Sequence, residues 1–128
     1  MNFTGTILLV DDESHIRKFV ALILKQLGSP VLFEARNGEE ALEVYRRENP
    51  DLVLLDISMP KMDGIETLKA LKVIDPNCVV IMLTSIVNRE TIEQAIEAGA
   101  ANYIRKDIPK DEIAKALQET IESIFDLG

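Results

Sequence analysis

The sequence has 128 residues, 47% of them hydrophobic, which is enough to bury one sizeable core but leaves no room for a second folded domain. Its 22 acidic and 14 basic residues give a formal net charge of −8, which repels DNA phosphates and argues against nucleic-acid binding. The single cysteine, Cys78, excludes an intramolecular disulfide framework, and no apolar run approaches the length of a membrane span. We therefore expect one soluble domain over residues 1–128, located in the reducing cytoplasm.

Short apolar runs alternate along the chain with stretches of helical periodicity. The first, third and fourth runs are apolar without alternation, which is typical of parallel strands covered by helices on both faces. We expect these three runs to form the middle of a sheet. The predicted strands are Ile7–Val10, Val31–Phe33, Leu52–Leu55, Val79–Leu83 and Ala101–Ile104.

A helical pattern follows each run and is clearest in the first, where one apolar stripe extends from Ile16 to Leu27 and ends at Gly28. Asp63 and Asn88 are the expected N-caps of the third and fourth helices. The remaining helices are predicted at Gly38–Glu48, Gly64–Lys72, Arg89–Ala98 and Lys110–Phe125, with Gly99 in a left-handed position after the fourth. Strand followed by helix, repeated in this way with right-handed crossovers, predicts a doubly wound α/β fold with helices on both faces of a parallel sheet.

Acidic residues collect where two of the predicted central strands end. Asp11 and Asp12 close the first strand, and Asp56 closes the third. If these strands are neighbours, the carboxylates meet at the carboxyl edge of the sheet, where ligands bind in such folds and where like charges call for a cation. Mg²⁺ prefers oxygen ligands of this kind, and an aspartate beside it is a reasonable nucleophile for a phosphoryl group.

Two later strands end in groups that phosphoryl transfer requires. Thr84 ends the fourth strand with a hydroxyl that can donate to a phosphate oxygen, and Lys106 follows the fifth with an ammonium that can pair with another. Transfer of a phosphoryl group depends mainly on positioning and charge neutralisation, which these residues supply without a separate base.

Taken together, these motifs resemble the receiver domains of bacterial response regulators over essentially the whole chain. The resemblance implies a flavodoxin-like (βα)5 fold with a five-stranded parallel sheet in the order 2-1-3-4-5. The motifs that carry it are Val10-Asp11-Asp12-Glu13, Leu54-Leu55-Asp56, Met59-Pro60-Lys61-Met62-Asp63-Gly64, Leu83-Thr84 and Tyr103-Ile104-Arg105-Lys106.

The same resemblance implies a role for each site residue. Asp56 is the phosphoacceptor, and Thr84 and Lys106 hold the phosphoryl oxygens. Tyr103 matches the family's switch aromatic, whose ring moves inward when Thr84 shifts toward the phosphate. The implied ligands of Mg²⁺ are Asp56, Asp12, the backbone carbonyl of Ser58 and, largely through water, Asp11.

The resemblance also implies partners. A sensor histidine kinase or a phosphotransfer protein donates to Asp56, and the surface of the fourth helix, fifth strand and fifth helix then changes its affinity for a downstream target. Because the sequence ends directly after the fifth helix, it resembles stand-alone regulators of the chemotaxis kind. We expect a monomer or weak dimer that is a switch rather than an enzyme.

Three positions depart from the family pattern. Lys106 is followed by Asp107 where receivers usually have a proline after a cis bond, so a trans bond and a reshaped loop are predicted. Asp107 also brings a negative charge close to Lys106 that can weaken its hold on phosphate. Ser85 replaces a smaller residue after Thr84, and Ala101-Asn102 replaces an acidic pair that often accompanies one mode of dimerisation.

Four other interpretations remain open on the sequence. The chain can be a degenerate receiver that acts as an interaction module without phosphorylation, or the receiver fragment of a longer transcriptional regulator. A flavodoxin-like cofactor binder shares the fold, but Asp12 and Glu13 would repel a flavin phosphate. A phosphatase with an aspartate nucleophile would instead turn over free substrate.

Overall fold

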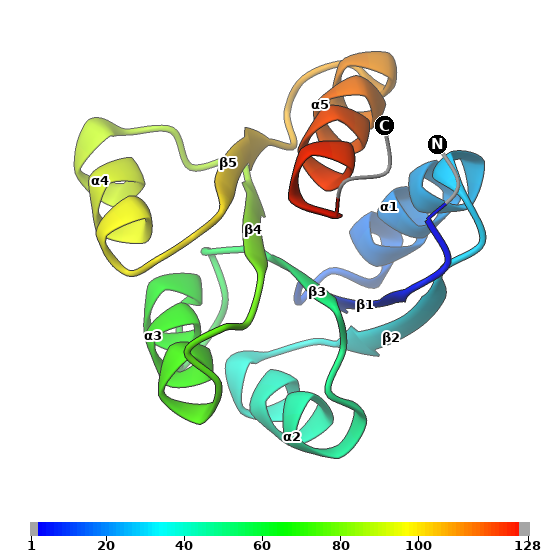
Figure 1. Cartoon of the computed structure of the whole chain (residues 1–128). Coiled ribbons are helices and arrows are strands. Elements are labelled where there is room, and N and C mark those ends of the chain that lie inside the picture. The colour runs from blue at the N-terminus through cyan, green and yellow to red at the C-terminus, as the bar shows by residue number, and fades with distance from the viewer. Residues whose placement is uncertain (1–2, 126–128) are drawn as a thin grey trace.

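The computed structural model describes residues 3–125 and contains a single parallel sheet between two layers of helices (Figure 1). The sheet has five strands in the order β2-β1-β3-β4-β5, as predicted. In chain order the elements are β1 (Thr6–Val10), α1 (Ser14–Leu27), β2 (Val31–Ala35), α2 (Gly38–Glu48), β3 (Leu52–Leu55), α3 (Gly64–Ile74), β4 (Val80–Thr84), α4 (Arg89–Glu97), β5 (Asn102–Arg105) and α5 (Lys110–Phe125).

The three strands without alternation occupy the centre of the sheet. Every residue of β3 and β4 is buried, and in β1 only the first residue is partly exposed. The edge strands β2 and β5 are more exposed, in agreement with their mixed sequences. Continuous apolar sequence therefore predicted correctly which strands are covered on both faces.

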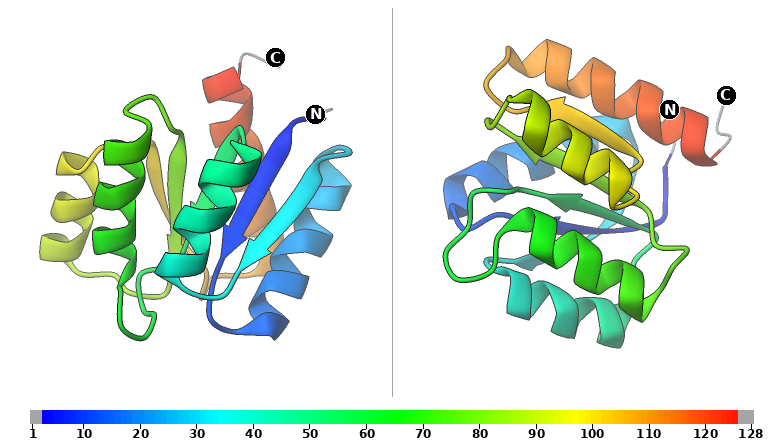
Figure 2. Two further views of the ribbon diagram at one scale, coloured as in Figure 1. Left: turned by 90° about the horizontal axis from the view of Figure 1, so that it is seen from below. Right: turned by 90° about the vertical axis from the view of Figure 1, so that its left-hand side faces the viewer.

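Each face of the sheet carries its own hydrophobic core. Helices α2, α3 and α4 cover one face, and α1 and α5 cover the other (Figure 2). Successive side chains of a strand point to opposite faces, so Leu8 and Val10 enter the first core while Ile7 and Leu9 enter the second. Cys78 is buried in the first core as a small apolar residue.

Capping residues fix the starts of the helices that follow the strands. The side chains of Asn37, Asp63 and Asn88 each accept a hydrogen bond from a backbone N–H at the start of α2, α3 and α4. Gly99 has a φ of 98° after α4, so the predicted left-handed position is confirmed. Within residues 3–125, no helix has both the length and the apolar character needed to cross a membrane.

Candidate functional site

The acidic residues predicted from the sequence meet at the carboxyl edge of the sheet. Val10 of β1 pairs with Leu55 of β3, so the residues that follow them lie side by side, and the Asp56 N–H donates to the Val10 carbonyl at 3.0 Å. One carboxylate oxygen from each of Asp11, Asp12 and Asp56 lies within 4.8 Å of the others. Asp11 and Asp56 are 6% and 2% exposed, whereas Asp12 is open to solvent.

Lys106, which directly follows the edge strand β5, brings a positive charge into this cluster. Its Nζ lies 2.8 Å from Asp11 Oδ2 and 3.1 Å from Asp56 Oδ2. Burial disfavours the charged ammonium, but the hydrogen bond to Asp11 and the charge of Asp56 outweigh it and raise the pKa of Lys106 above its usual value. The lysine therefore remains protonated at neutral pH and offsets part of the negative charge.

Backbone N–H groups orient the two buried carboxylates. Asp11 Oδ1 accepts from the Glu13 N–H at 3.0 Å, and Asp56 Oδ1 accepts from the Ile57 N–H at 2.8 Å. The start of α3 presses against this point, because Gly64 lies so close to the backbone of Asp56 and Ile57 that no Cβ fits there. Each carboxylate thus has one oxygen on the backbone and the other on Lys106.

Thr84 and Tyr103 meet at one residue of the loop between β4 and α4. Thr84 is completely buried, and its Oγ1 accepts from the Ile86 N–H at 3.3 Å. The Tyr103 hydroxyl donates to the carbonyl of the same Ile86 at 2.5 Å. Burial raises the pKa of the Tyr103 phenol, and the charge of Asp56 adds to the effect. The predicted pair is therefore linked through Ile86, while its role as a switch stays a prediction.

Two serines named in the sequence analysis lie at the surface of the site. Ser58 is exposed in the loop that joins β3 to α3, two residues after Asp56, and the role of its carbonyl as a ligand stays a prediction. Ser85 is exposed directly after the buried Thr84.

In the loop after Lys106, the Asp107 side chain pairs with Arg105 and not with the lysine. The peptide bond between them is trans, as predicted. Arg105 Nε and Nη2 donate to Asp107 Oδ1 and Oδ2, each at 2.9 Å, and this bidentate pair lowers the pKa of Asp107. The Asp107 carboxylate thus engages Arg105, whereas Lys106 engages Asp11 and Asp56.

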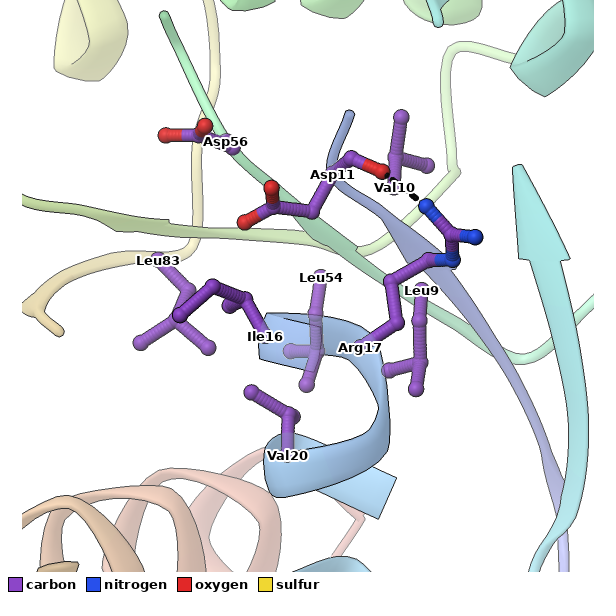
Figure 3. A pocket seen from close by; sticks show the side chains of 9 residues that line it. All are labelled: Leu9, Val10, Asp11, Ile16, Arg17, Val20, Leu54, Asp56 and Leu83. Atoms are coloured by element: carbon purple, nitrogen blue, oxygen red, sulfur yellow. Dashed lines mark hydrogen bonds between the residues drawn. The ribbon is translucent and has the colours of Figure 1, made fainter. Parts of the chain in front are cut away.

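The sequence analysis missed Arg17, which lines a small pocket with Asp11 and Asp56 on the α1 side of the site (Figure 3). Its Nη1 donates to the backbone carbonyl of Asp11 at 2.6 Å, and its Nε donates to Glu34 Oε1 at 2.9 Å. One signal was available in the sequence: a charged residue directly after Ile16, five residues after Asp12.

The donor set fits a hard divalent cation. Asp11 and Asp56 share the ammonium of Lys106 and Asp12 lies beside them, so negative charge remains in excess at this edge of the sheet. Carboxylate oxygens are the ligands that Mg²⁺ prefers, and it commonly uses only one or two of them together with water and substrate phosphate. The chemistry of Asp11, Asp12 and Asp56 is therefore compatible with a magnesium site.

Known proteins resemble this chain in both sequence and fold. A family model described as "Response regulator receiver domain" matches residues 7–118. The chemotaxis protein CheY of Bacillus subtilis (strain 168) is 40% identical over 115 residues, which are 90% of this chain and 96% of that protein. Sporulation initiation phosphotransferase F of the same organism is 42% identical over 113 residues, 88% of this chain and 90% of that protein.

Solved structures show the same similarity. A chain from the CheX-CheY-BeF3-Mg+2 complex of Borrelia burgdorferi superposes with a TM-score of 0.85 at 33% identity, covering 94% of this chain and 87% of that chain. Vibrio cholerae chemotaxis protein CheY4 superposes with a TM-score of 0.82 at 28% identity, covering 92% of this chain and 99% of that chain.

Proposed function

The chain belongs to the response regulator receiver family, and we propose that it is a phosphorylation switch in which Asp56 accepts a phosphoryl group. The observation that carries the proposal is the position of the Asp56 carboxylate, buried beside Asp11 and Asp12 and paired with Lys106 at 3.1 Å. Such a carboxylate is fixed in orientation, and Lys106 together with a bound Mg²⁺ would offset the charge of an incoming phosphoryl group. The donor is a phosphohistidine on a sensor kinase or a phosphotransfer protein.

In the proposed reaction, a carboxylate oxygen of Asp56 attacks phosphorus. The new P–O bond forms an acyl phosphate, the P–N bond breaks, and its electron pair returns to the imidazole nitrogen of the donor, which takes up a proton. Asp12, Asp56, the Ser58 carbonyl and, largely through water, Asp11 would hold Mg²⁺, which would supply positive charge that offsets the charge of both reactants. Lys106 and the Thr84 hydroxyl bind the remaining phosphoryl oxygens.

The proposed switch then runs from the site to the surface through Ile86. A phosphoryl group on Asp56 attracts the Thr84 hydroxyl, which in the structure accepts from the Ile86 N–H at 3.3 Å. A shift of this loop moves the Ile86 carbonyl, to which the Tyr103 hydroxyl donates, and so changes the position of the Tyr103 ring. Phosphorylation thereby shifts the population of surfaces formed by α4, β5 and α5, and the affinity for a downstream protein changes with it.

The remaining features of the proposal follow from the family and the charge. We assign residues 1–128 to one receiver domain that acts in the cytoplasm as a monomer or weak dimer. Its net charge of −8 disfavours nucleic acid as a partner. It is a signalling protein, modified once per signal, rather than an enzyme that releases product from free substrate.

The test is phosphotransfer to the wild type and to Asp56→Asn, followed by intact mass. Incubation with a small phosphodonor such as acetyl phosphate and Mg²⁺ should add one phosphoryl group to the wild type and none to the variant. Chelation of the metal with EDTA should prevent the addition. Asp63→Asn is the matched control, because it neutralises an acid of the adjacent loop while an asparagine can still cap α3.

Two results would contradict this assignment. Label that persists on Asp56→Asn would place the acceptor elsewhere. A wild type that gains no phosphoryl group from acetyl phosphate or from a phosphorylated kinase would instead support an interaction module that works without phosphorylation.

A further inference from the structure

Arg17 is a largely buried charge with two separate partners. It occupies the fourth position of α1, and its side chain is only 15% exposed. Nε donates to Glu34 on the edge strand β2, while Nη1 donates to the backbone carbonyl of Asp11. Because a charge withdrawn from water is costly unless it is paired, these two bonds hold the guanidinium in one place.

The carbonyl that Arg17 binds belongs to the peptide unit that leads from Asp11 into Asp12. This unit is planar, so the direction of its carbonyl fixes the direction in which the chain enters Asp12. The Asp11 N–H donates to the Ala35 carbonyl at 3.1 Å, which anchors the other side of the same residue to β2. Arg17 and β2 together therefore fix the backbone position from which the exposed Asp12 side chain projects.

We propose that Arg17 is a positioning residue that sets the affinity of the acidic cluster for Mg²⁺ through the Asp11 carbonyl. The inference rests on the proposed function for the metal site, but it adds a residue outside the ligand set. Arg17 is not among the groups proposed to bind the metal or the phosphoryl oxygens, and its partners are Glu34 and the Asp11 carbonyl. Its forked guanidinium fits the role, because a lysine has one nitrogen and cannot reach Asp11 and Glu34 from fixed, separate donors.

Charge alone predicts the opposite result, which makes the proposal testable. A cation beside three carboxylates repels Mg²⁺, so removing it should strengthen metal binding if Arg17 acts only through its charge. If Arg17 acts by holding the Asp11–Asp12 peptide, removing it should weaken metal binding. Arg17→Lys separates the two effects, since it keeps the charge and loses the fork.

The experiment measures the Mg²⁺ dissociation constant of the unphosphorylated protein by isothermal titration calorimetry. Arg17→Lys and Arg17→Gln should both raise it, by about tenfold, as is usual for residues that orient metal ligands. Arg89→Lys and Arg89→Gln are the matched controls and should leave it unchanged, because Arg89 forms an exposed ion pair with Glu93 on α4. NMR spectra of the metal-free protein should show the Asp12 and Glu13 amides shifted in the Arg17 variants only.

A second set of variants approaches the same contact from β2. Glu34→Ala removes the partner of Arg17 Nε and should weaken Mg²⁺ binding, whereas Glu34→Gln keeps an acceptor and should weaken it less. These variants and Arg17→Lys decide the matter if Arg17→Gln does not fold, which urea unfolding will reveal. At saturating Mg²⁺, phosphorylation of Arg17→Lys should return to the wild-type rate.

The proposal is wrong if Arg17→Lys binds Mg²⁺ as tightly as the wild type and Arg17→Gln binds it as tightly or more tightly. That outcome is independent of the phosphoacceptor assignment, because the calorimetry involves no phosphoryl donor. A wild type that binds Mg²⁺ but is never phosphorylated would overturn the proposed function and leave the role of Arg17 standing.

Discussion

The two ends of the sheet treat acidic residues in opposite ways. At the amino end, Asp51 precedes β3 and accepts from the N–H and hydroxyl of Thr6 at 2.8 and 3.1 Å. Asp75, after α3, accepts from the Tyr45 hydroxyl at 2.9 Å. Each of these carboxylates stands apart from the other and is satisfied by neutral donors. Such acids stabilise the fold, and their hydrogen bonds are made without a further ligand.

At the carboxyl end, acids crowd together instead. Asp11, Asp12 and Asp56 place oxygens within 4.8 Å of one another, and Asp11 and Asp56 share Lys106. Like charges at this distance repel, so the cluster costs stability until a cation binds. The difference teaches which acids serve the fold and which serve a ligand. Neutralising an acid at one end should therefore change stability in the opposite direction from neutralising an acid at the other.

The largest effect on stability is expected from Lys106→Ala. Removing the ammonium leaves Asp11 and Asp56 buried without a positive partner, which should lower the free energy of unfolding by about 3 kcal/mol in metal-free buffer. Added Mg²⁺ should recover part of this loss by binding the acidic cluster. Urea unfolding with and without Mg²⁺ measures both, with the exposed Lys110→Ala as the control. An unfolding curve equal to that of the wild type would mean that the cluster does not depend on this lysine.

The next effect compares one acid from each end. Asp51→Asn should destabilise the protein by ~1 kcal/mol, because an amide oxygen is a weaker acceptor for the Thr6 backbone and hydroxyl. Asp12→Asn should stabilise the metal-free protein by about 0.5 kcal/mol, because it removes one of three mutually repelling charges. The same Asp12 variant should bind Mg²⁺ more weakly. Urea unfolding without metal decides the signs, and two changes of the same sign would break the comparison.

The sequence predicted the carboxyl end well because that end depends on strand order. The apolar runs place β1 and β3 in the middle of the sheet, and the strand order implied by the family resemblance makes them neighbours. Asp11 and Asp56 then emerge together, and no side-chain detail is needed. The contacts of Arg17 and Asp107 could not be predicted in this way. Each depends on the direction in which a loop turns and on which of several acceptors a flexible side chain reaches. The bond from Tyr45 to Asp75 joins residues 30 apart in sequence and has no local signal.

Tyr45→Phe tests the amino end alone. Losing the hydrogen bond to Asp75 should lower the free energy of unfolding by ~1 kcal/mol at neutral pH. Burial, reinforced by Asp75, raises the pKa of the Tyr45 phenol in the folded state, so the unfolded chain ionises first, near pH ~10. Stability contributed by the neutral phenol is therefore lost as the pH rises above that value. The free energy of unfolding, measured with urea between neutral and alkaline pH, should fall less steeply for the variant than for the wild type. Parallel pH dependences in the two proteins would contradict this assignment.

The smallest effect is expected at Asp107, a fourth acid, which lies next to Lys106 in sequence but pairs with Arg105. Arg105 holds both oxygens of Asp107, so Arg105→Ala should free that carboxylate beside Lys106 and slow phosphorylation of Asp56 by about threefold at low salt. Asp107→Ala alone should leave the rate unchanged, and the double variant should regain it because the competing charge is gone. Stopped-flow rates with acetyl phosphate measure all three. If the double variant stays as slow as Arg105→Ala, the arginine shapes the loop and does not divert a charge from Lys106.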